Sequence, residues 1–238
     1  MLADRIDEIQ AALVEAELDA WLFAVFQGND PISLDLLGLT GRHLVTRRCY
    51  YLVPRRGEPR KLCHALEPWM LDHLPGGKTI YLTWQEHRER LTQLVRDCRR
   101  LAAQYSPKNE LPSVSRLDHG TAELLAAAGC DLETSADLVQ RFAATWSDEQ
   151  LASHRRANEH LHRIVKEAFA FTREALRAGR SIDEHAVARF IVEAFARVGL
   201  WAEADPIVGV NAHSADPHYV PEATGSSPIR SATRIRAS

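Results

Sequence analysis

The most informative stretch of this chain is a short apolar run that leads into a polar loop: Asp205-Pro206-Ile207-Val208-Gly209-Val210-Asn211-Ala212-His213-Ser214-Ala215-Asp216-Pro217-His218-Tyr219-Val220-Pro221. The run from Pro206 to Val210 predicts a strand, because short runs rich in β-branched residues favour strands. The loop after it holds His213 and His218. An isolated histidine rarely carries chemistry, so the loop alone leaves both as ordinary surface residues.

Two amphipathic helices precede this stretch. Ser147 followed by Gln150 matches a capping box, which satisfies the free amides at a helix start, and the apolar period continues to Gly179. Ser181 with Glu184 predicts the same cap for a second helix. The pair forms a helical hairpin whose two apolar stripes need a sheet to cover them, and one strand does not suffice.

The sequence changes character after Val220. Residues 229–238 contain three arginines and no apolar periodicity, which predicts an irregular, basic tail. The pattern is lost abruptly after Ile229 or Arg230. We hypothesise a frameshift, a truncated reading frame or a gene-calling artefact at this point.

The first 145 residues mix strand-like and helix-like segments and predict one α/β domain. The predicted strands are residues 20–26, 49–53, 61–65 and 79–82, and the predicted helices are residues 4–17, 91–101 and 121–128. The Pro and Gly residues between 53 and 61 favour a hairpin. We therefore expect two domains, residues 1–145 and 147–230, with residues 231–238 as a tail.

The composition is that of a globular protein that buries a core. The chain has 238 residues, of which 45% are hydrophobic and 26% charged, with a net charge of -3. This slightly acidic balance does not favour nucleic-acid binding. No apolar run is long enough for a membrane span and the first residues do not form a signal peptide, so we expect a cytoplasmic protein. The four cysteines show no CxxC spacing and are expected to be buried thiols.

Three stretches together resemble the M24 metallopeptidase family, in the branch of Xaa-Pro aminopeptidases, prolidases and creatinase. The first is the segment 205–221, which is similar to the family signature that ends in His-Tyr. The second is the helix pair 147–199. The third is a set of N-terminal segments, residues 36–40, 46–48, 57–59 and 64–68. The resemblance implies a creatinase-type N-terminal α/β domain followed by the N-terminal part of a pita-bread α+β catalytic domain.

The resemblance also implies a site. Members bind two divalent metals (Mn, Co or Zn) through two Asp, a His and two Glu, all placed after the His-Tyr motif. Paired metals lower the pKa of a shared water that attacks the peptide carbonyl. His218 matches the family histidine that contacts the substrate or the tetrahedral intermediate. No Asp or Glu follows Glu222, so we expect no metal ligand and no bound metal in this chain.

The resulting interpretation is a dinuclear-metal Xaa-Pro aminopeptidase or dipeptidase by resemblance, acting on proline-containing peptides, with this chain inactive by itself. A creatinase-like C–N hydrolase stays open as the ancestor. The alternative is a non-catalytic dimerisation or regulatory module that pairs with a full-length homologue or forms a homodimer. A serine or cysteine hydrolase lacks a GxSxG or cysteine-centred motif. His154, His160 and His162 lie among arginines on a helix and are expected to be solvated.

Overall fold

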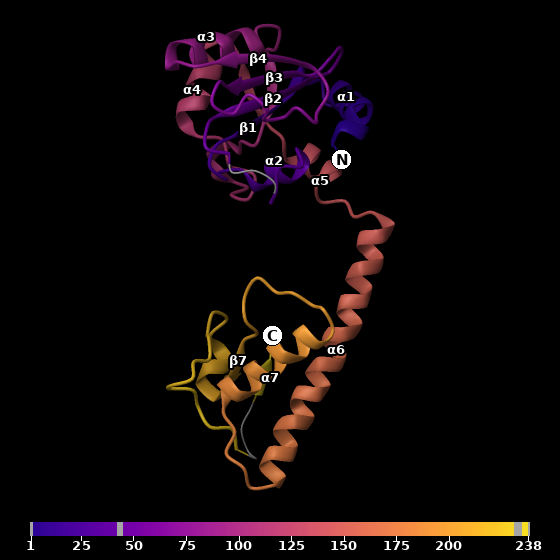
Figure 1. Ribbon diagram of the computed structural model, residues 1–238, viewed down its shortest axis with the longest axis vertical. Coiled ribbons are helices and arrows are strands. Elements are labelled where there is room, and N and C mark those ends of the chain that lie inside the picture. Colours follow the sequence, from indigo (N-terminus) through magenta and orange to yellow (C-terminus); the bar gives the residue numbers. More distant parts are fainter. Residues whose placement is uncertain (1, 42–44, 231–234, 238) are drawn as a thin grey trace. The chain divides into compact units, whose positions relative to one another are not determined.

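The chain folds into two compact units, Met1–Thr145 and Trp146–Ser238. The computed structural model describes residues 2–41, 45–230 and 235–237. Figure 1 shows the two units, with the N-terminal one in indigo to magenta and the C-terminal one in orange to yellow.

A six-stranded mixed sheet forms the centre of the N-terminal unit. Its order is β4-β3-β2-β1-β5-β6. The strands are β1 (Ala20–Val25), β2 (Cys49–Pro54), β3 (Arg60–His64), β4 (Gly77–Tyr81), β5 (Arg100–Ala103) and β6 (Asp131–Thr134). β2 pairs antiparallel with β1 and β3, whereas β3–β4, β1–β5 and β5–β6 are parallel.

Helices cover both faces of this sheet. One face carries α1 (Ile6–Glu15), α2 (Pro31–Leu36) and α5 (Ala136–Phe142), with the short 3-10 turn Leu2–Arg5, and the other carries α3 (Trp84–Val95) and α4 (His119–Ala127). A further 3-10 turn spans Pro107–Asn109. Successive residues of a strand point to opposite faces, so Trp21 and Phe23 enter one core and Leu22 the other. The unbroken apolar run of β1 is therefore buried on both sides.

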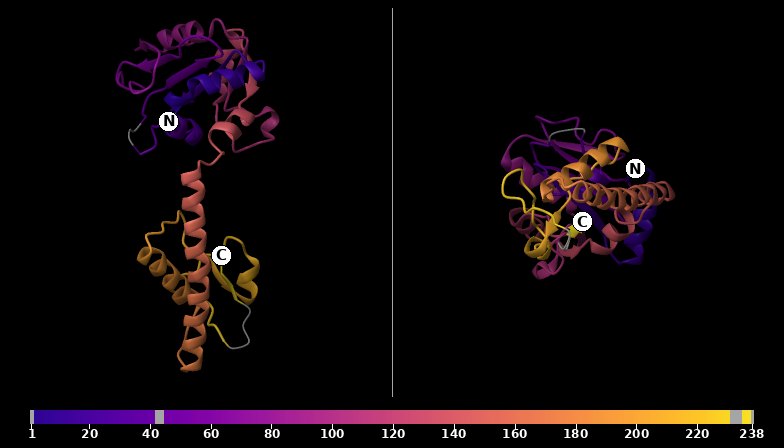
Figure 2. Two further views of the ribbon diagram at one scale, coloured as in Figure 1. Left: turned by 90° about the vertical axis from the view of Figure 1, so that its right-hand side faces the viewer. Right: turned by 90° about the horizontal axis from the view of Figure 1, so that it is seen from below.

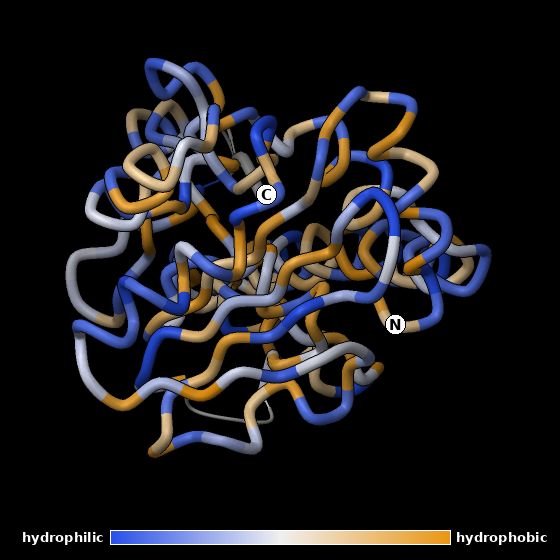
Figure 3. Tube along the Cα trace, turned by 90° about the horizontal axis from the view of Figure 1, so that it is seen from above, coloured by the Kyte–Doolittle hydropathy of each residue, from blue (hydrophilic) through white to orange (hydrophobic). Residues whose placement is uncertain are grey.

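Hydropathy follows this layering. In Figure 3 apolar segments run through the middle of the view, and many of the turns at its edge are hydrophilic. The predicted hairpin is confirmed, since β2 and β3 pair antiparallel with Tyr50 opposite Leu62. The helix predicted over residues 91–101 is wrong in its extent, because α3 ends at Val95 and Leu101 belongs to β5. The short apolar run Leu101-Ala102-Ala103 is part of a buried strand. Leu101 also lies at helical spacing from Leu91, so the apolar period alone includes it in the helix.

The C-terminal unit consists of two helices and a small two-stranded sheet. Its elements are α6 (Asp148–Arg177), α7 (Glu184–Arg197), β7 (Val208–Val210), the 3-10 turn η3 (Asn211–Ala215) and β8 (Ile235–Ala237). The buried faces of α6 and α7 share a core with β7, and the rings of Phe171 and Phe190 stack at 4.6 Å. Among the described elements of this unit, none lies beside the first turns of α6 (Figures 1 and 2).

The ends of these helices correct the sequence reading at one point. The capping box of Ser147 and Gln150 is present. The second helix, however, is capped by Asp183, whose side chain accepts a hydrogen bond from the amide of Ala186, and not by Ser181. Glu184 therefore plays no capping role, and its side chain is available for other contacts.

The expected irregular tail also differs. Residues 235–237 form β8, which pairs antiparallel with β7, while residues 231–234 and 238 lie outside the described part of the chain. Among the described residues, no helix has both the length and the apolar character needed to cross a membrane.

Candidate functional site

The candidate site is built around one fully buried carboxylate, that of Glu184. Glu184 is the first residue of α7, and its side chain is 0% exposed. Because Asp183 already caps the helix, the Glu184 side chain can accept hydrogen bonds from the end of β7 and from the segments that follow it. A buried charge needs hydrogen bonds or a partner to offset its loss of solvation.

Four groups donate hydrogen bonds to this carboxylate. The amide of Val210 donates to Oε1 over 2.7 Å, and the amide of Ser227 donates to Oε2 over 2.7 Å. The phenol of Tyr219 donates to Oε2 over 2.6 Å. Nδ1 of His213 lies 3.0 Å from Oε1 and 3.1 Å from Oε2. We call Glu184 and these four donors the Glu184 network.

The donors keep the carboxylate charged. Burial acts to raise the pKa of Glu184, but the hydrogen bonds from Tyr219, Ser227, Val210 and His213 outweigh it, so the pKa lies below its usual value. A carboxylate that accepts several hydrogen bonds is stabilised in its ionised form. The Glu184 network is therefore a fixed negative charge inside the unit.

Two aromatic rings complete the network. The imidazole of His213 stacks on the ring of Tyr219, with centroids 4.2 Å apart and planes 24° from parallel. The turn η3 reaches this position because Gly209 has no side chain: a Cβ at Gly209 would lie 2.8 Å from the carbonyl oxygen of His213. The glycine within the apolar run thus permits a close backbone approach.

The sequence-predicted site residue, His218, lies on the exposed surface beside the network. Its neighbour Tyr219 is anchored to Glu184, and its own amide donates to Oδ1 of Asp216 over 2.8 Å. No hydrogen bond to its imidazole is found among the described residues. The structure thus brings His213 and Tyr219 together and holds His218 on the same segment.

Sequence reasoning missed the residue that organises the site. The sequence pattern places Glu184 in a helix cap, and its donors lie 26 to 43 residues further along the chain. The sequence carries one signal for this role: Glu184 directly follows Asp183, which can cap the helix without it. The sequence distinguishes Tyr219 only as part of the His-Tyr motif.

The three histidines of α6 form no site in the described part of the chain. His154, His160 and His162 lie along α6, where His154 and His162 are exposed and His160 is half-buried. Nδ1 of His160 lies 2.8 Å from the Arg163 guanidinium. In the described ranges, no group of three or more His, Cys, Asp or Glu side chains is arranged to hold a metal ion.

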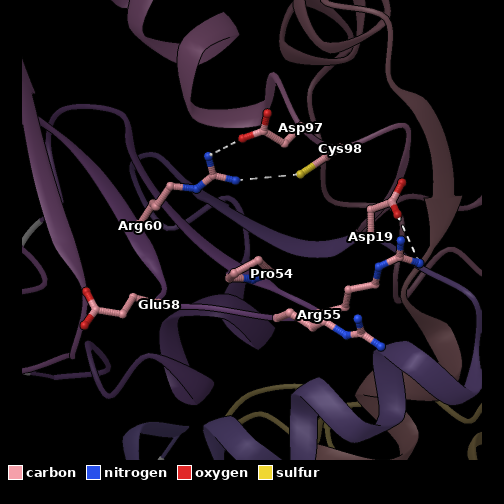
Figure 4. Close-up of a pocket in the computed structure, with 8 residues that line it drawn as sticks. Asp19, Pro54, Arg55, Glu58, Arg60, Asp97 and Cys98 are labelled. Carbon is pink, nitrogen blue, oxygen red and sulfur yellow. Dashed lines mark hydrogen bonds and ion pairs between the residues drawn. The ribbon is translucent and has the colours of Figure 1, made fainter.

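The N-terminal unit has a cleft of about 370 Å³, shown in Figure 4. The guanidinium of Arg60 lies 3.4 Å from Oδ2 of Asp97 and 3.9 Å from the sulfur of Cys98. Arg55 lies 3.4 Å from Oδ1 of Asp19. The full lining is Asp19, Pro54, Arg55, Arg56, Glu58, Arg60, Asp97 and Cys98.

The chemistry of this cleft does not favour catalysis. Its three arginines are balanced by three carboxylates, so it carries no net charge for a charged ligand. Burial raises the pKa of Cys98 to about 11, which leaves the thiol unreactive near neutral pH. The Glu184 network is therefore the better candidate.

Comparison with known proteins establishes the fold. No protein-family model matches the sequence, and no curated protein matches it. The solved structures of prolidases and related dipeptidases do match, across both units of the chain. Dipeptidase PepE from Mycobacterium ulcerans has a TM-score of 0.67 at 19% identity, covering 99% of this chain and 59% of that one.

Two further structures agree. The Xaa-Pro dipeptidase from Bacillus anthracis has a TM-score of 0.61 at 14% identity, covering 99% of this chain and 59% of that one. The prolidase from Pyrococcus horikoshii OT3 has a TM-score of 0.59 at 17% identity, covering 98% and 59%. The chain therefore has the α/β fold found in part of these proteins and spans 59% of their length. The fold expected from the resemblance is confirmed.

The carboxylates described at this site do not fit the two metal ions of the M24 resemblance. Both oxygens of Glu184 are already occupied by donors. Asp216 accepts from the amide of His218. We therefore derive no catalytic step through a metal from these residues.

Proposed function

We propose that this chain carries the substrate-contacting front part of an Xaa-Pro aminopeptidase or dipeptidase, an enzyme that hydrolyses the peptide bond before proline. The observation that supports this proposal is the fold, which matches a prolidase over 98% of the chain and an Xaa-Pro dipeptidase over 99%. On this proposal the ligand is a proline-containing peptide and the location is cytoplasmic.

His218 is the proposed catalytic residue. Its imidazole is exposed on a segment that Tyr219 fixes to a buried carboxylate. An imidazole held in this way can donate a hydrogen bond to the oxygen that becomes negative when a peptide carbonyl is attacked. Stabilisation of this charge is the role that we propose for His218.

The proposal includes a limit on the activity of this polypeptide. In the M24 resemblance, the reaction depends on two divalent metals such as Mn, Co or Zn, which supply an activated water. Glu222 is the one acidic residue of this sequence that follows the His-Tyr motif, so the chain does not supply the two Asp and two Glu of that ligand set. We propose that the chain by itself binds proline-containing peptides without hydrolysing them.

Two measurements on the full chain test this function. Nuclear magnetic resonance with Gly-Pro as the probe should show shifts at His218, and Gly-Gly should bind less well. Elemental analysis after incubation with Mn²⁺, Co²⁺ or Zn²⁺, together with a Gly-Pro hydrolysis assay, should show no stoichiometric metal and no turnover. Bound metal with turnover would contradict the proposed inactivity, and the absence of any Gly-Pro binding would contradict the proposed substrate contact.

One observation favours the alternative, a non-catalytic module that pairs with a second copy or a full-length homologue. Leu161, Val165 and Phe169 recur every fourth residue on α6 and are 42%, 39% and 45% exposed. Residues at this spacing share one helix face, so they form an apolar stripe in contact with solvent. Trp201 of the same unit is 85% exposed. Apolar surface of this kind marks interaction sites.

The oligomeric state discriminates this alternative. Light scattering coupled to gel filtration should give a dimer for the unchanged chain and a monomer for Val165→Lys. Lys166→Ala, a change at the next residue of the same helix, is the control. A monomeric unchanged chain that also fails to associate with a full-length homologue would exclude the module.

A further inference from the structure

The contact between His213 and Glu184 defines where the imidazole proton lies. An ionised carboxylate only accepts hydrogen bonds, and Nδ1 of His213 is within 3.1 Å of both Glu184 oxygens. Nδ1 therefore carries the proton. In a neutral imidazole the other nitrogen, Nε2, then has a free lone pair. No described residue bonds Nε2, and the His213 side chain is 36% exposed.

The same carboxylate fixes the backbone on both sides of His218. Val210 is held at the end of β7, His213 in the turn η3 and Tyr219 just past His218. The segment between residues 210 and 219 is thus attached at three points to one group. A side chain in this segment has a defined position because its neighbours are held by hydrogen bonds to a buried charge.

We propose that Glu184 is the positioning residue of this site. Its carboxylate holds His213 with a proton on Nδ1, so that Nε2 of His213 accepts a hydrogen bond from an N–H group of the bound peptide. The same carboxylate holds His218 in place through Tyr219. This inference rests on the proposed function, because the positioned segment is the one that carries His218. It adds a second peptide contact, Nε2 of His213.

Position 184 requires a carboxylate, because hydrogen-bond donors contact both of its side-chain oxygens and each oxygen must act as an acceptor. A glutamine at position 184 has one acceptor oxygen and one NH₂ group. In either orientation of the amide, its NH₂ group would face the amide of Val210 or that of Ser227, each of which is also a donor. Glu184→Gln therefore disrupts the network while preserving the size of the side chain.

The adjacent residue offers a matched control. Asp183→Asn removes the same charge one position earlier, and asparagine caps a helix about as well as aspartate. The Asp183 side chain accepts only from the amide of Ala186 among the contacts described, so the Glu184 network should persist.

The experiment is ¹⁵N magnetic resonance of the histidine rings in the full chain at about pH 8.5, well above the ordinary histidine pKa of about 6.5. The unchanged chain and Asp183→Asn should show His213 with a proton on Nδ1 and none on Nε2. Glu184→Gln should lose this preference and weaken Gly-Pro binding about tenfold, the effect of one lost hydrogen bond.

The outcomes separate this inference from the proposed function. A proton on Nε2 of His213 in the unchanged chain overturns the inference, and this reading needs no folded variant. An unaltered proton position and Gly-Pro affinity in Glu184→Gln overturn it as well. If the unchanged chain has the expected proton position but Gly-Pro shifts only His218, the second contact is refuted. If Gly-Pro shifts neither histidine, the proposed function fails, and the inference that rests on it fails with it.

Discussion

The phenol of Tyr219 donates to Oε2 of Glu184 over 2.6 Å, and this bond joins the His-Tyr motif to the first residue of a helix 35 positions earlier. It is one of the contacts that keep the carboxylate ionised. The motif therefore contains an anchor, Tyr219, and an exposed partner, His218, with different physical roles.

Tyr219→Phe should lower the free energy of unfolding by about 1.5 to 3 kcal/mol, the range for a hydrogen bond to a charged group. Phenylalanine keeps the ring that stacks on His213, so the decrease in the free energy of unfolding comes from the lost hydroxyl group alone. Urea denaturation followed by circular dichroism measures it. Tyr105→Phe is the control, since the Tyr105 hydroxyl bonds no described residue, and an equal loss in both variants would contradict the role assigned to Tyr219.

Ser147→Ala should destabilise the start of α6 by about 1 kcal/mol, because the Ser147 side chain accepts from the amide of Gln150. Ser181→Ala should have no comparable effect, since Asp183 caps α7. Thermal unfolding of both variants makes the comparison. A loss at Ser181 as large as that at Ser147 would restore the cap that the sequence suggested.

The stability of the N-terminal unit should depend on His87. Nε2 of His87 lies 2.9 Å from the Tyr50 hydroxyl, and burial, assisted by the charge of Arg48, lowers the pKa of His87. The unfolded chain therefore binds this proton more readily than the folded one. Stability is complete above the unfolded histidine pKa of about 6.5 and is lost as the pH falls toward the folded value.

His87→Gln should flatten this acid-side loss. Denaturant midpoints measured between about pH 8 and pH 5 give the slope for each variant. His119→Gln, at an exposed position of α4, is the control. An unchanged slope in His87→Gln would assign the loss to other groups.

Gly76→Ala should be severely destabilising. Gly76 has φ of +101°, and a Cβ there would lie 2.0 Å from the carbonyl oxygen of Pro59. Gly57 has φ of +87° with nothing within 4 Å of such a Cβ. Gly57→Ala should therefore cost about 1 to 2 kcal/mol for the backbone conformation alone, and Gly76→Ala about 2 to 5 kcal/mol. Equal losses in denaturant titrations would contradict the close approach.

Local patterns predicted the elements whose causes are local. The hairpin of β2 and β3 follows from two apolar runs around a Pro- and Gly-containing turn, and the start of α6 follows from Ser147 and Gln150. Apolar periodicity failed at Leu101, because a four-residue buried strand and a helix turn present the same short run.

The candidate site shows the same division. His218 was identified from a motif of adjacent residues, but Glu184 was not, because no spacing rule connects a residue to donors 26 to 43 positions away. The Asp183 side chain accepts a hydrogen bond from the amide of Ala186, three residues further along the chain. A cap at Ser181 would accept a hydrogen bond from the amide three residues after it in the same way. The sequence alone therefore does not distinguish two competing caps that lie two positions apart.

The sharing of Glu184 has a consequence for how this part of the protein opens. Val210 and Ser227 are distant in sequence, yet their amides donate hydrogen bonds to the two carboxylate oxygens of Glu184. Movement of that side chain releases both amides together, so they belong to one cooperative opening event and not to two independently fraying loops. Their hydrogen-exchange rates should accordingly yield one common opening free energy, and the segment bearing His218 should become ordered or disordered as a whole.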